Sequence, residues 1–430
     1  MNSRRLLGGL FATAALGAIW CAPAHADSGD ADPLNALMMG GTGMPTPSEF
    51  WRDTIITDYI NPATGQDYTS VLVPTPESAA STSIPVGLAN LQAAMDAQPA
   101  GQPYLVEGYS QSAQIAVQEK LLLMQLEPDS RPDVTFLLLG SGNRPDGGFL
   151  ERFAGLVIPG APGFDFNGAE PTNAGITTID IANQYDAVAD FPQYPVNLVS
   201  DANALLGFFY AHAGYGNGPL PYEVPAIWPP SDPLPPLDAQ FADQYVLGST
   251  EVVRQVEGDT TFYFIPANTL PLLEPLRSLG VPEPVLKIFQ PALQVLVEAG
   301  YDRSVPFSEP TPAELVPTLD PVTFTLQFAN GVAQGANNAF ALFGAELPGF
   351  DELESFFDEA QAWSEETIGV PYYQFVSDLN DAFNPFTAFI DIEGPIGAEI
   401  QNLLDLTGIQ QNLLDPVLGL VGSLGGMFTS

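Results

Sequence analysis

The feature that most constrains this chain is an apolar run that stops at a small residue, turns on Ser110 and continues with helical spacing. The run is Pro103-Tyr104-Leu105-Val106-Glu107-Gly108-Tyr109-Ser110-Gln111-Ser112-Ala113, and residues 114–125 have the helical pattern. It is typical of a buried strand that enters a helix through a sharp turn. Strand and helix crowd such a turn, so the residues two before and two after the serine must be small, as Gly108 and Ser112 are.

This layout has a chemical consequence for Ser110. At a helix N-terminus, the N–H of Gln111 and the helix dipole can stabilise negative charge that develops beside the hydroxyl. The arrangement is that of the nucleophile elbow of α/β-hydrolases. A Gly-x-Ser-x-Gly/Ser string alone arises often by chance. The apolar lead-in and the helical exit strengthen the case for a nucleophile, and an ordinary turn stays the alternative.

The N-terminus has the pattern of a secretory signal. Two arginines precede the apolar run 6–22, and Ala24-His25-Ala26 is a typical cleavage site, so residues 1–26 are predicted to be removed. Bulky Trp20 disfavours lipidation of Cys21. Because Cys21 is the only cysteine, the mature chain lacks disulfides, a cysteine nucleophile and thiolate metal sites. We expect a secreted or cell-envelope-associated protein.

The charge balance is strongly acidic. The formal net charge is −40, and loss of the signal's two arginines makes it −42. Such a surface repels nucleic acid and anionic headgroups, so no nucleic-acid partner is expected. After the signal, residues 280–300 and 416–428 are apolar, but neither resembles a membrane span. We therefore expect peripheral association with the envelope at most, and the motifs imply no metal or cofactor.

Alternating strand and helix patterns predict an α/β fold with a mainly parallel sheet covered on both faces. Active sites in such folds collect at the carboxyl ends of the strands. The predicted strands are 34–39, 71–73, 103–109, 134–139 and 176–181, with a hairpin over 251–256 and 260–265, and the predicted helices are 49–59, 84–97, 114–125, 196–210, 272–279 and 285–299.

A glycine-rich loop follows the first predicted strand, at Gly40-Gly41-Thr42-Gly43. Glycines there let the backbone approach a ligand closely. Two interpretations stay open: an oxyanion loop that supplies an N–H from Thr42 or Gly43, or a plain tight turn. A phosphate-binding loop is disfavoured because no Gly-Lys-Ser/Thr follows.

Histidine content narrows the chemistry. The chain has two histidines, and His25 leaves with the signal, so His212 must be the base of any Ser-His-acid triad. The acid would come from the loop that carries Asp186 and Asp190, which gives the α/β-hydrolase order of serine, acid, histidine. The alternative is a histidine that caps the end of a helix.

The last third of the chain differs in composition. After Arg303 there are 18 acidic residues and no basic one, which predicts a domain boundary near 310. Residues 27–310 would form the α/β domain, and 311–430 a mostly helical extension with amphipathic stretches at 350–366, 373–383 and 396–406. The extension is either a solvated tail or a docking element for apolar envelope material.

The proline-rich segment 216–238 is either a stiff surface excursion or a flap over the site.

Together these motifs resemble the PE-PPE domain of mycobacterial α/β serine hydrolases, here as a stand-alone secreted form. The likeness spans roughly 34–303 and rests on several motifs in order: Gly40-Gly41-Thr42-Gly43, Gly108-Tyr109-Ser110-Gln111-Ser112, Asn143-Arg144-Pro145-Asp146-Gly147-Gly148, Gln184-Tyr185-Asp186 to Pro195, and Gly300-Tyr301-Asp302-Arg303. The pentapeptide is also similar to that of cutinases. The resemblance implies an α/β-hydrolase fold and esterase activity on acyl esters, with transfer of acyl chains onto trehalose-type glycolipids in some members.

Carried over residue by residue, the resemblance gives Ser110 as nucleophile, His212 as base and Asp186 as acid. Asp190 and Asp201 are the weaker candidates for the acid. The oxyanion hole would combine the N–H of Gln111 with one from Thr42 or Gly43. A hydrolytic esterase is the first hypothesis, an acyltransferase acting on envelope glycolipids the second, and a non-catalytic lipid-binding protein the third.

Overall fold

A computed structural model describes residues 33–156, 165–216 and 241–382. The predicted signal, the proline-rich segment after Gly216 and the predicted helix 396–406 lie outside these ranges. Within them, no helix combines the length and the apolar character needed to cross a bilayer.

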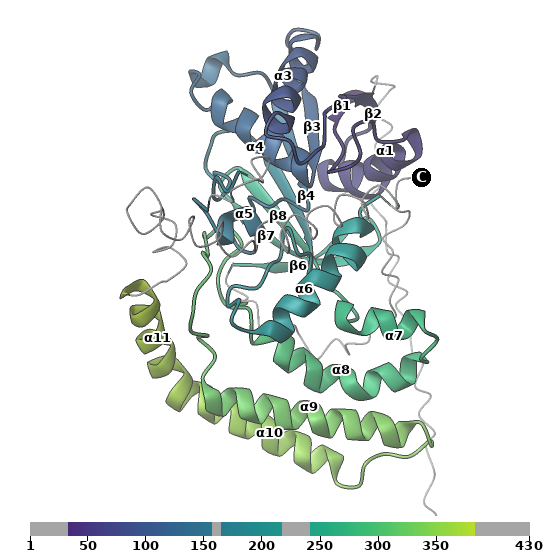
Figure 1. Ribbon diagram of the computed structural model, residues 1–430, viewed down its shortest axis with the longest axis vertical. Helices are drawn as coiled ribbons and strands as arrows, with labels where there is room; N and C mark the ends of the chain where they lie inside the picture. The colour runs from purple at the N-terminus through teal and green to yellow at the C-terminus, as the bar shows by residue number, and fades with distance from the viewer. Residues whose placement is uncertain (1–32, 157–164, 217–240, 383–430) are drawn as a thin grey trace, which may run out of the picture. The chain divides into compact units, whose positions relative to one another are not determined.

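The described residues form an eight-stranded sheet in the order β2-β1-β3-β4-β5-β8-β7-β6 (Figure 1). The pairs from β2 to β8 are parallel, and β7 and β6 complete one edge with antiparallel pairs. The predicted α/β class with a mainly parallel sheet is confirmed. The strands are β1 (Leu34–Met38), β2 (Tyr68–Leu72), β3 (Tyr104–Tyr109), β4 (Val134–Leu139), β5 (Thr178–Asn183), β6 (Asp243–Leu247), β7 (Thr250–Glu257) and β8 (Thr260–Ile265).

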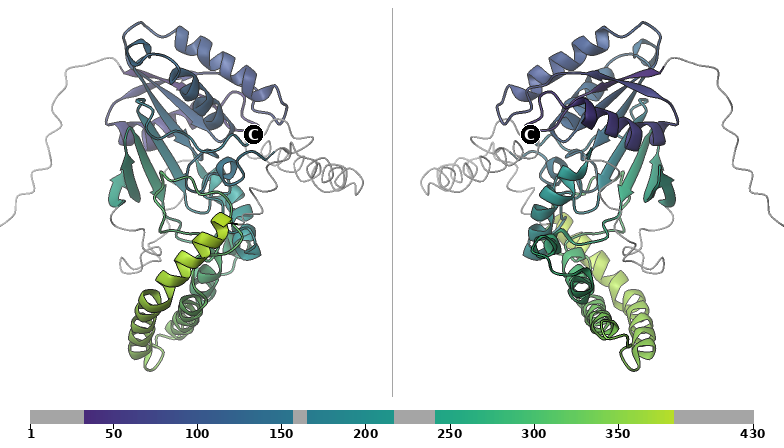
Figure 2. Two further views of the ribbon diagram at one scale, coloured as in Figure 1. Left: turned by 90° about the vertical axis from the view of Figure 1, so that its left-hand side faces the viewer. Right: turned by 90° about the vertical axis from the view of Figure 1, so that its right-hand side faces the viewer.

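Helices cover both faces of the sheet (Figure 2). Alternate residues of the central strands point to opposite sides, which gives two apolar layers. One face packs against α1 and the π-helical turn that follows it, and the other packs against α3 and α4. The helices of this part are α1 (Glu49–Ile55), α2 (Asn61–Thr64), α3 (Ser83–Asp96), α4 (Gln111–Leu123), α5 (Phe149–Arg152), α6 (Leu198–Tyr210), α7 (Glu274–Ser278) and α8 (Glu283–Glu298).

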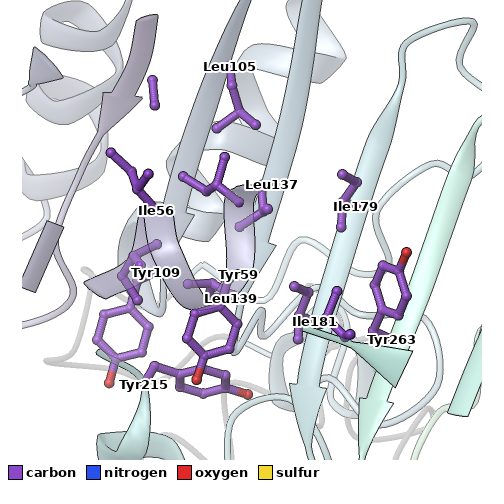
Figure 3. Packing of buried hydrophobic residues seen from close by; sticks show 14 of the residues in the cluster. Ile56, Tyr59, Leu105, Tyr109, Leu137, Leu139, Ile179, Ile181, Tyr215 and Tyr263 are labelled. Carbon is purple, nitrogen blue, oxygen red and sulfur yellow. The ribbon is translucent and has the colours of Figure 1, made fainter. Parts of the chain in front are cut away.

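The apolar layer on the α1 face leads toward the carboxyl ends of the strands. Figure 3 shows its aliphatic side chains, such as Leu105 and Leu137, giving way to the aromatic rings of Tyr59, Tyr109 and Tyr215. These three tyrosines are almost fully buried. Burial of such large side chains contributes a major part of core stability. The aromatic end of this layer borders the residues predicted to carry the chemistry.

A mostly helical extension follows the sheet domain, as predicted. It consists of α9 (Pro321–Ala341), α10 (Phe350–Ser364), a π-helical turn and α11 (Val370–Ala382). Helix α9 packs closely on α8, because a Cβ on Gly331 would lie 2.9 Å from the Cα of Ala292. Figure 1 shows α10 running alongside α9.

The connection between sheet domain and extension is firmly attached. Arg152 donates to the carbonyl and the hydroxyl of Thr311, and the Thr311 hydroxyl also bonds Asp146 at 2.9 Å. Further along, the hydroxyls of Tyr194 and Thr318 lie 2.9 Å apart. The predicted boundary at 310 therefore falls inside a bonded segment, and as a domain limit it stays a prediction.

Candidate active site

The predicted strand-turn-helix places Ser110 between β3 and α4. Its backbone has φ 57° and ψ −115°, a conformation that a non-glycine residue adopts only under constraint. Its N–H donates to the Leu139 carbonyl at 3.0 Å, and the Ser112 hydroxyl accepts the N–H of Tyr109 at 2.9 Å. A Cβ on Gly108 would lie 2.6 Å from the Ser112 carbonyl oxygen, so the turn requires glycine there.

His212 bridges Ser110 and Asp186. Its Nε2 lies 2.8 Å from the Ser110 Oγ, and its Nδ1 lies 2.9 Å from the Asp186 Oδ2. With the hydrogen on Nδ1, the imidazole donates to the carboxylate and accepts from the serine hydroxyl. The serine and the histidine are 102 positions apart in the sequence, so the topology of the sheet brings them together.

The His212 ring is held from two sides by aromatic rings. Tyr109 stacks on it at a centroid distance of 5.2 Å, and Phe208 on it at 5.4 Å. The Tyr109 hydroxyl donates to the His212 carbonyl at 2.8 Å. A Cβ on Gly140 would lie 2.9 Å from the His212 Cε1, so glycine keeps room for the ring. His212 follows α6 in a 3₁₀ turn, and the stacking fixes its plane rather than leaving it as a helix cap.

Asp186 sits in the loop after β5 and is fully buried. Its Oδ1 accepts the N–H groups of Val188 at 2.7 Å and of Ala189 at 3.2 Å, and both carboxylate oxygens face the imidazole, with Oδ1 at 2.8 Å and Oδ2 at 2.9 Å from the His212 Nδ1. Burial, and next the charge of Asp186, raises the pKa of the Tyr215 hydroxyl well above its ordinary value. The carboxylate thus has hydrogen-bond partners on both oxygens.

The two other candidate acids lie in different surroundings. Asp190 holds Arg303 through both carboxylate oxygens, at 2.6 and 3.1 Å. Asp201 lies in the first turn of α6, where burial raises its pKa to about 6. Among the described contacts of His212, the carboxylate partner is Asp186.

The glycine-rich loop lies against the serine. A Cβ on Gly41 would lie 3.0 Å from the Ser110 Cβ. The N–H of Gly43, however, donates to the Glu77 carbonyl at 2.8 Å. In this conformation the Gly43 N–H is therefore engaged, which favours Thr42, half-buried beside it, as the donor. The oxyanion role of Thr42 or Gly43 stays a prediction.

Gln111 follows Ser110 and is anchored through its side chain. Its Oε1 accepts the hydroxyl of Ser83 at 2.8 Å, and its Nε2 donates to the Ser78 carbonyl at 3.0 Å. These bonds tie the first turn of α4 to the segment that also carries Glu77. The N–H of Gln111 at the helix N-terminus is thus held in a fixed place beside Ser110.

Sequence reasoning missed several residues around the site. Burial raises the pKa of Glu77 to about 8 and that of Glu107 well above its ordinary range. Glu107 lies on β3, and its Oε2 accepts the Met39 N–H at 3.3 Å. A glutamate inside a continuous apolar run was the signal for a buried carboxyl. The role of Phe208 had no comparable signal, because aromatic residues are common on apolar helix faces.

No group of three or more histidine, cysteine, aspartate or glutamate side chains suited to a metal occurs in the part of the chain that the structure describes.

Comparison with known proteins identifies the family of this chain. The family model described as "PE-PPE domain" matches residues 59–302, which include Ser110, Asp186 and His212. The chain belongs to this family. The match ends just before Arg303, so the helical extension lies beyond it.

Three curated relatives come from Mycobacterium tuberculosis. The chain is 34% identical to "PE family protein PE3" over 73% of its own length and 64% of the relative's. It is 34% identical to "Esterase PE16" over 69% and 54%, and 29% identical to "Diacyltrehalose acyltransferase Chp2" over 51% and 57%. The chain thus spans about half to two thirds of the length of these relatives.

Among solved structures, a cutinase-like protein from Cryptococcus sp. overlaps 36% of this chain and 77% of its own, with 20% identity and a TM-score of 0.26. At that score the likeness is too low to support a conclusion about this chain.

Proposed function

We propose that this protein is a secreted serine esterase that cleaves acyl esters through Ser110, His212 and Asp186. The observation that carries the proposal is the continuous hydrogen-bonded line from the Ser110 hydroxyl through the His212 imidazole to the Asp186 carboxylate. The strained backbone of Ser110 and the relative named as an esterase support it.

In the proposed reaction, His212 Nε2 takes the proton of the Ser110 hydroxyl while the Oγ attacks the ester carbonyl. Asp186 stabilises the imidazolium that forms and keeps the ring in the required orientation. The N–H groups of Gln111 and Thr42 would donate to the oxyanion. The imidazolium then gives its proton to the leaving alcohol, and an acyl-serine remains.

Water completes the cycle. His212 takes a proton from the water as it attacks the acyl-serine, and Ser110 leaves with that proton as the acid is released. The buried imidazole and carboxylate lie away from bulk water, which strengthens the charge interactions within the site.

Steady-state hydrolysis of p-nitrophenyl butyrate tests the proposal. Ser110→Ala, His212→Ala and Asp186→Asn should each lower kcat/KM by about 10⁴-fold with an unchanged circular dichroism spectrum. Ser130→Ala, at an exposed serine in a surface turn, is the control and should match the wild type. Wild-type rates in the Ser110→Ala protein would refute the mechanism.

Acyl transfer is the second candidate, because one relative is named as a diacyltrehalose acyltransferase. The acyl-serine would be the same, and a sugar hydroxyl would replace water as the acceptor. Thin-layer analysis of products with and without trehalose separates the two functions. A new acylated sugar that depends on Ser110 favours transfer, whereas free acid alone favours hydrolysis.

A non-catalytic lipid-binding protein is the third candidate and predicts no ester cleavage by the wild type.

For the location of the protein, the N-terminal pattern supports export with cleavage after Ala26. N-terminal sequencing of the protein from culture filtrate and from envelope fractions tests this. A mature chain that starts at Asp27 is expected, and an intact Met1 in the cytosol would contradict export.

A further inference from the structure

The loop that presents Asp186 begins with a strained residue. Tyr185 has φ 64°, in the left-handed region that non-glycine residues seldom adopt. Such a conformation is energetically unfavourable and persists only where surrounding contacts impose it. Since Asp186 is the next residue, whatever holds Tyr185 also sets the direction of the Asp186 carboxylate.

The contact that holds the Tyr185 backbone comes from Asp190. The Asp190 Oδ2 accepts the Tyr185 N–H at 2.8 Å, and the Asp190 N–H donates to the Asp186 carbonyl at 2.7 Å. Asp190 therefore closes the loop by hydrogen bonds to two residues of the same loop. This closure needs the buried Asp190 carboxylate to be held in one orientation.

Arg303 supplies the matching charge from 113 positions away in the sequence. Its two terminal nitrogens bind both oxygens of Asp190, and its Nε donates to Glu298 at 2.9 Å. A planar guanidinium fixes a carboxylate in two directions at once, which an ammonium does not. The Arg303 side chain is only 6% exposed, so water cannot replace these contacts easily.

Glu298 links the guanidinium back to the same loop. Its Oε1 accepts the hydroxyl of Tyr185 at 2.6 Å and the Nε2 of Gln184 at 2.9 Å. Tyr185 is thus held by its backbone through Asp190 and by its side chain through Glu298. Both acceptors depend on Arg303, because without it the two buried carboxylates would lose the guanidinium that binds them directly.

We propose that Arg303 is a positioning residue that aims the Asp186 carboxylate at His212 by neutralising and orienting Asp190 and Glu298, an inference that rests on the proposed function. Arg303 touches neither the imidazole nor the serine in the described contacts. Its effect passes through Tyr185 to Asp186. The family match ends one residue earlier, at 302, so this arginine lies just outside the matched residues.

A double-mutant cycle on hydrolysis of p-nitrophenyl butyrate tests the inference. Arg303→Met should lower kcat by about 10²-fold with little change in KM, since a misaimed acid affects the transition state more than substrate binding. In the Asp186→Asn background, the same substitution should lower kcat by no more than about twofold, because its route of action is already lost. Arg303→Lys should restore part of the loss, as it keeps the charge but not the planar fork.

Lys120→Met is the matched control. Lys120 is also buried, paired with Glu170 at 3.8 Å, and lies on α4, the helix that follows Ser110, but it makes no described contact with the acid loop. It should lower Tm without a selective loss of kcat. If Arg303→Met does not fold, Arg303→Lys and Glu298→Gln carry the same cycle.

The outcomes separate the two proposals. Additive losses in the cycle, or full kcat in Arg303→Met and in Glu298→Gln, would overturn the positioning role while the wild type remained an esterase. An inactive wild type, or an active Ser110→Ala protein, would instead overturn the proposed function itself.

Discussion

The sheet domain and the helical extension differ in how far their aromatic side chains are buried and in whether their charged side chains are paired. In the sheet domain many large aromatic residues are buried, with Phe50 and Phe289 among the exceptions, and buried arginines such as Arg144 and Arg303 are paired with carboxylates. In α9–α11, Phe343, Phe375 and Trp363 are 87%, 64% and 57% exposed, and no basic residue balances the acids. The difference indicates that contacts which fix side chains in one orientation are concentrated in the sheet domain. The extension instead exposes apolar side chains.

The largest expected contrast is in catalysis. His212→Ala should abolish cleavage of a soluble short ester, with a loss of about 10⁴-fold or more, because the other histidine, His25, lies in the predicted signal. Phe343→Ser, at an aromatic residue that is 87% exposed, should leave the same rate unchanged. Initial rates with p-nitrophenyl acetate provide the measurement. A comparable loss in both variants would break the comparison.

Truncation sharpens where the sheet domain ends. A chain that stops after Pro310 loses Thr311 and leaves the buried side chains of Arg152 and Asp146 without that partner, so we expect it to be insoluble. A chain that stops after Leu319 keeps these bonds and should retain activity on short esters, although the exposed face of α8 should lower its Tm. Soluble yield and ester cleavage of the two proteins distinguish the cases. Equal behaviour would show that the bonded connector is not part of the domain.

A third contrast concerns the contact between the two regions. Gly331→Leu places a large side chain against Ala292, where even a Cβ would lie 2.9 Å from the Cα, and should separate α9 from α8. We expect faster proteolysis within α9–α11 but a kcat within about twofold of the wild type. Val332→Leu, next to it and half exposed, is the control. A large loss of kcat in Gly331→Leu would show that the extension shapes the site.

The smallest effect expected is a pH dependence of stability. Burial raises the pKa of Glu77 to about 8, whereas in the unfolded chain a glutamate titrates near 4.3, at about its ordinary value. The folded state therefore holds the extra proton between these values, and stability falls as pH rises through that window. Glu77→Gln removes this loss, so its Tm should equal that of the wild type at pH 5 and exceed it by a few degrees at pH 9.

Glu352→Gln, at an exposed site in α10, is the control for this effect. It should follow the wild type at every pH in differential scanning calorimetry. An identical pH profile for Glu77→Gln and the wild type would contradict the assignment of a protonated carboxyl beneath the glycine-rich loop.

The sequence made the centre of the sheet predictable and its edges less so. Strands buried on both faces are continuous apolar runs, so β1, β3, β4 and β5 were recognised within two residues. The edge strand β6, with the sequence Asp-Gln-Tyr-Val-Leu, is largely exposed and was missed. Helix α9 was missed too, since its glycines and asparagines have low helix propensity and are explained by packing on α8.

At the site, the sequence could not show contacts between residues that lie far apart in the chain. Spacing could not choose between Asp186 and Asp190, because the choice depends on Arg303, more than a hundred positions away. Nor could it show that the N–H of Gly43 is taken by the carbonyl of Glu77. The roles of Ser110, His212 and Asp186 stay predictions until the variants are measured.

The most direct test of the central claim is to locate the residue that an organophosphate modifies. The wild-type protein treated with diethyl p-nitrophenyl phosphate should carry one phosphoryl adduct, and tandem mass spectrometry of its peptides should place that adduct on Ser110, with none in His212→Ala. An adduct on another residue, or an unmodified Ser110 in folded wild-type protein, would contradict the account.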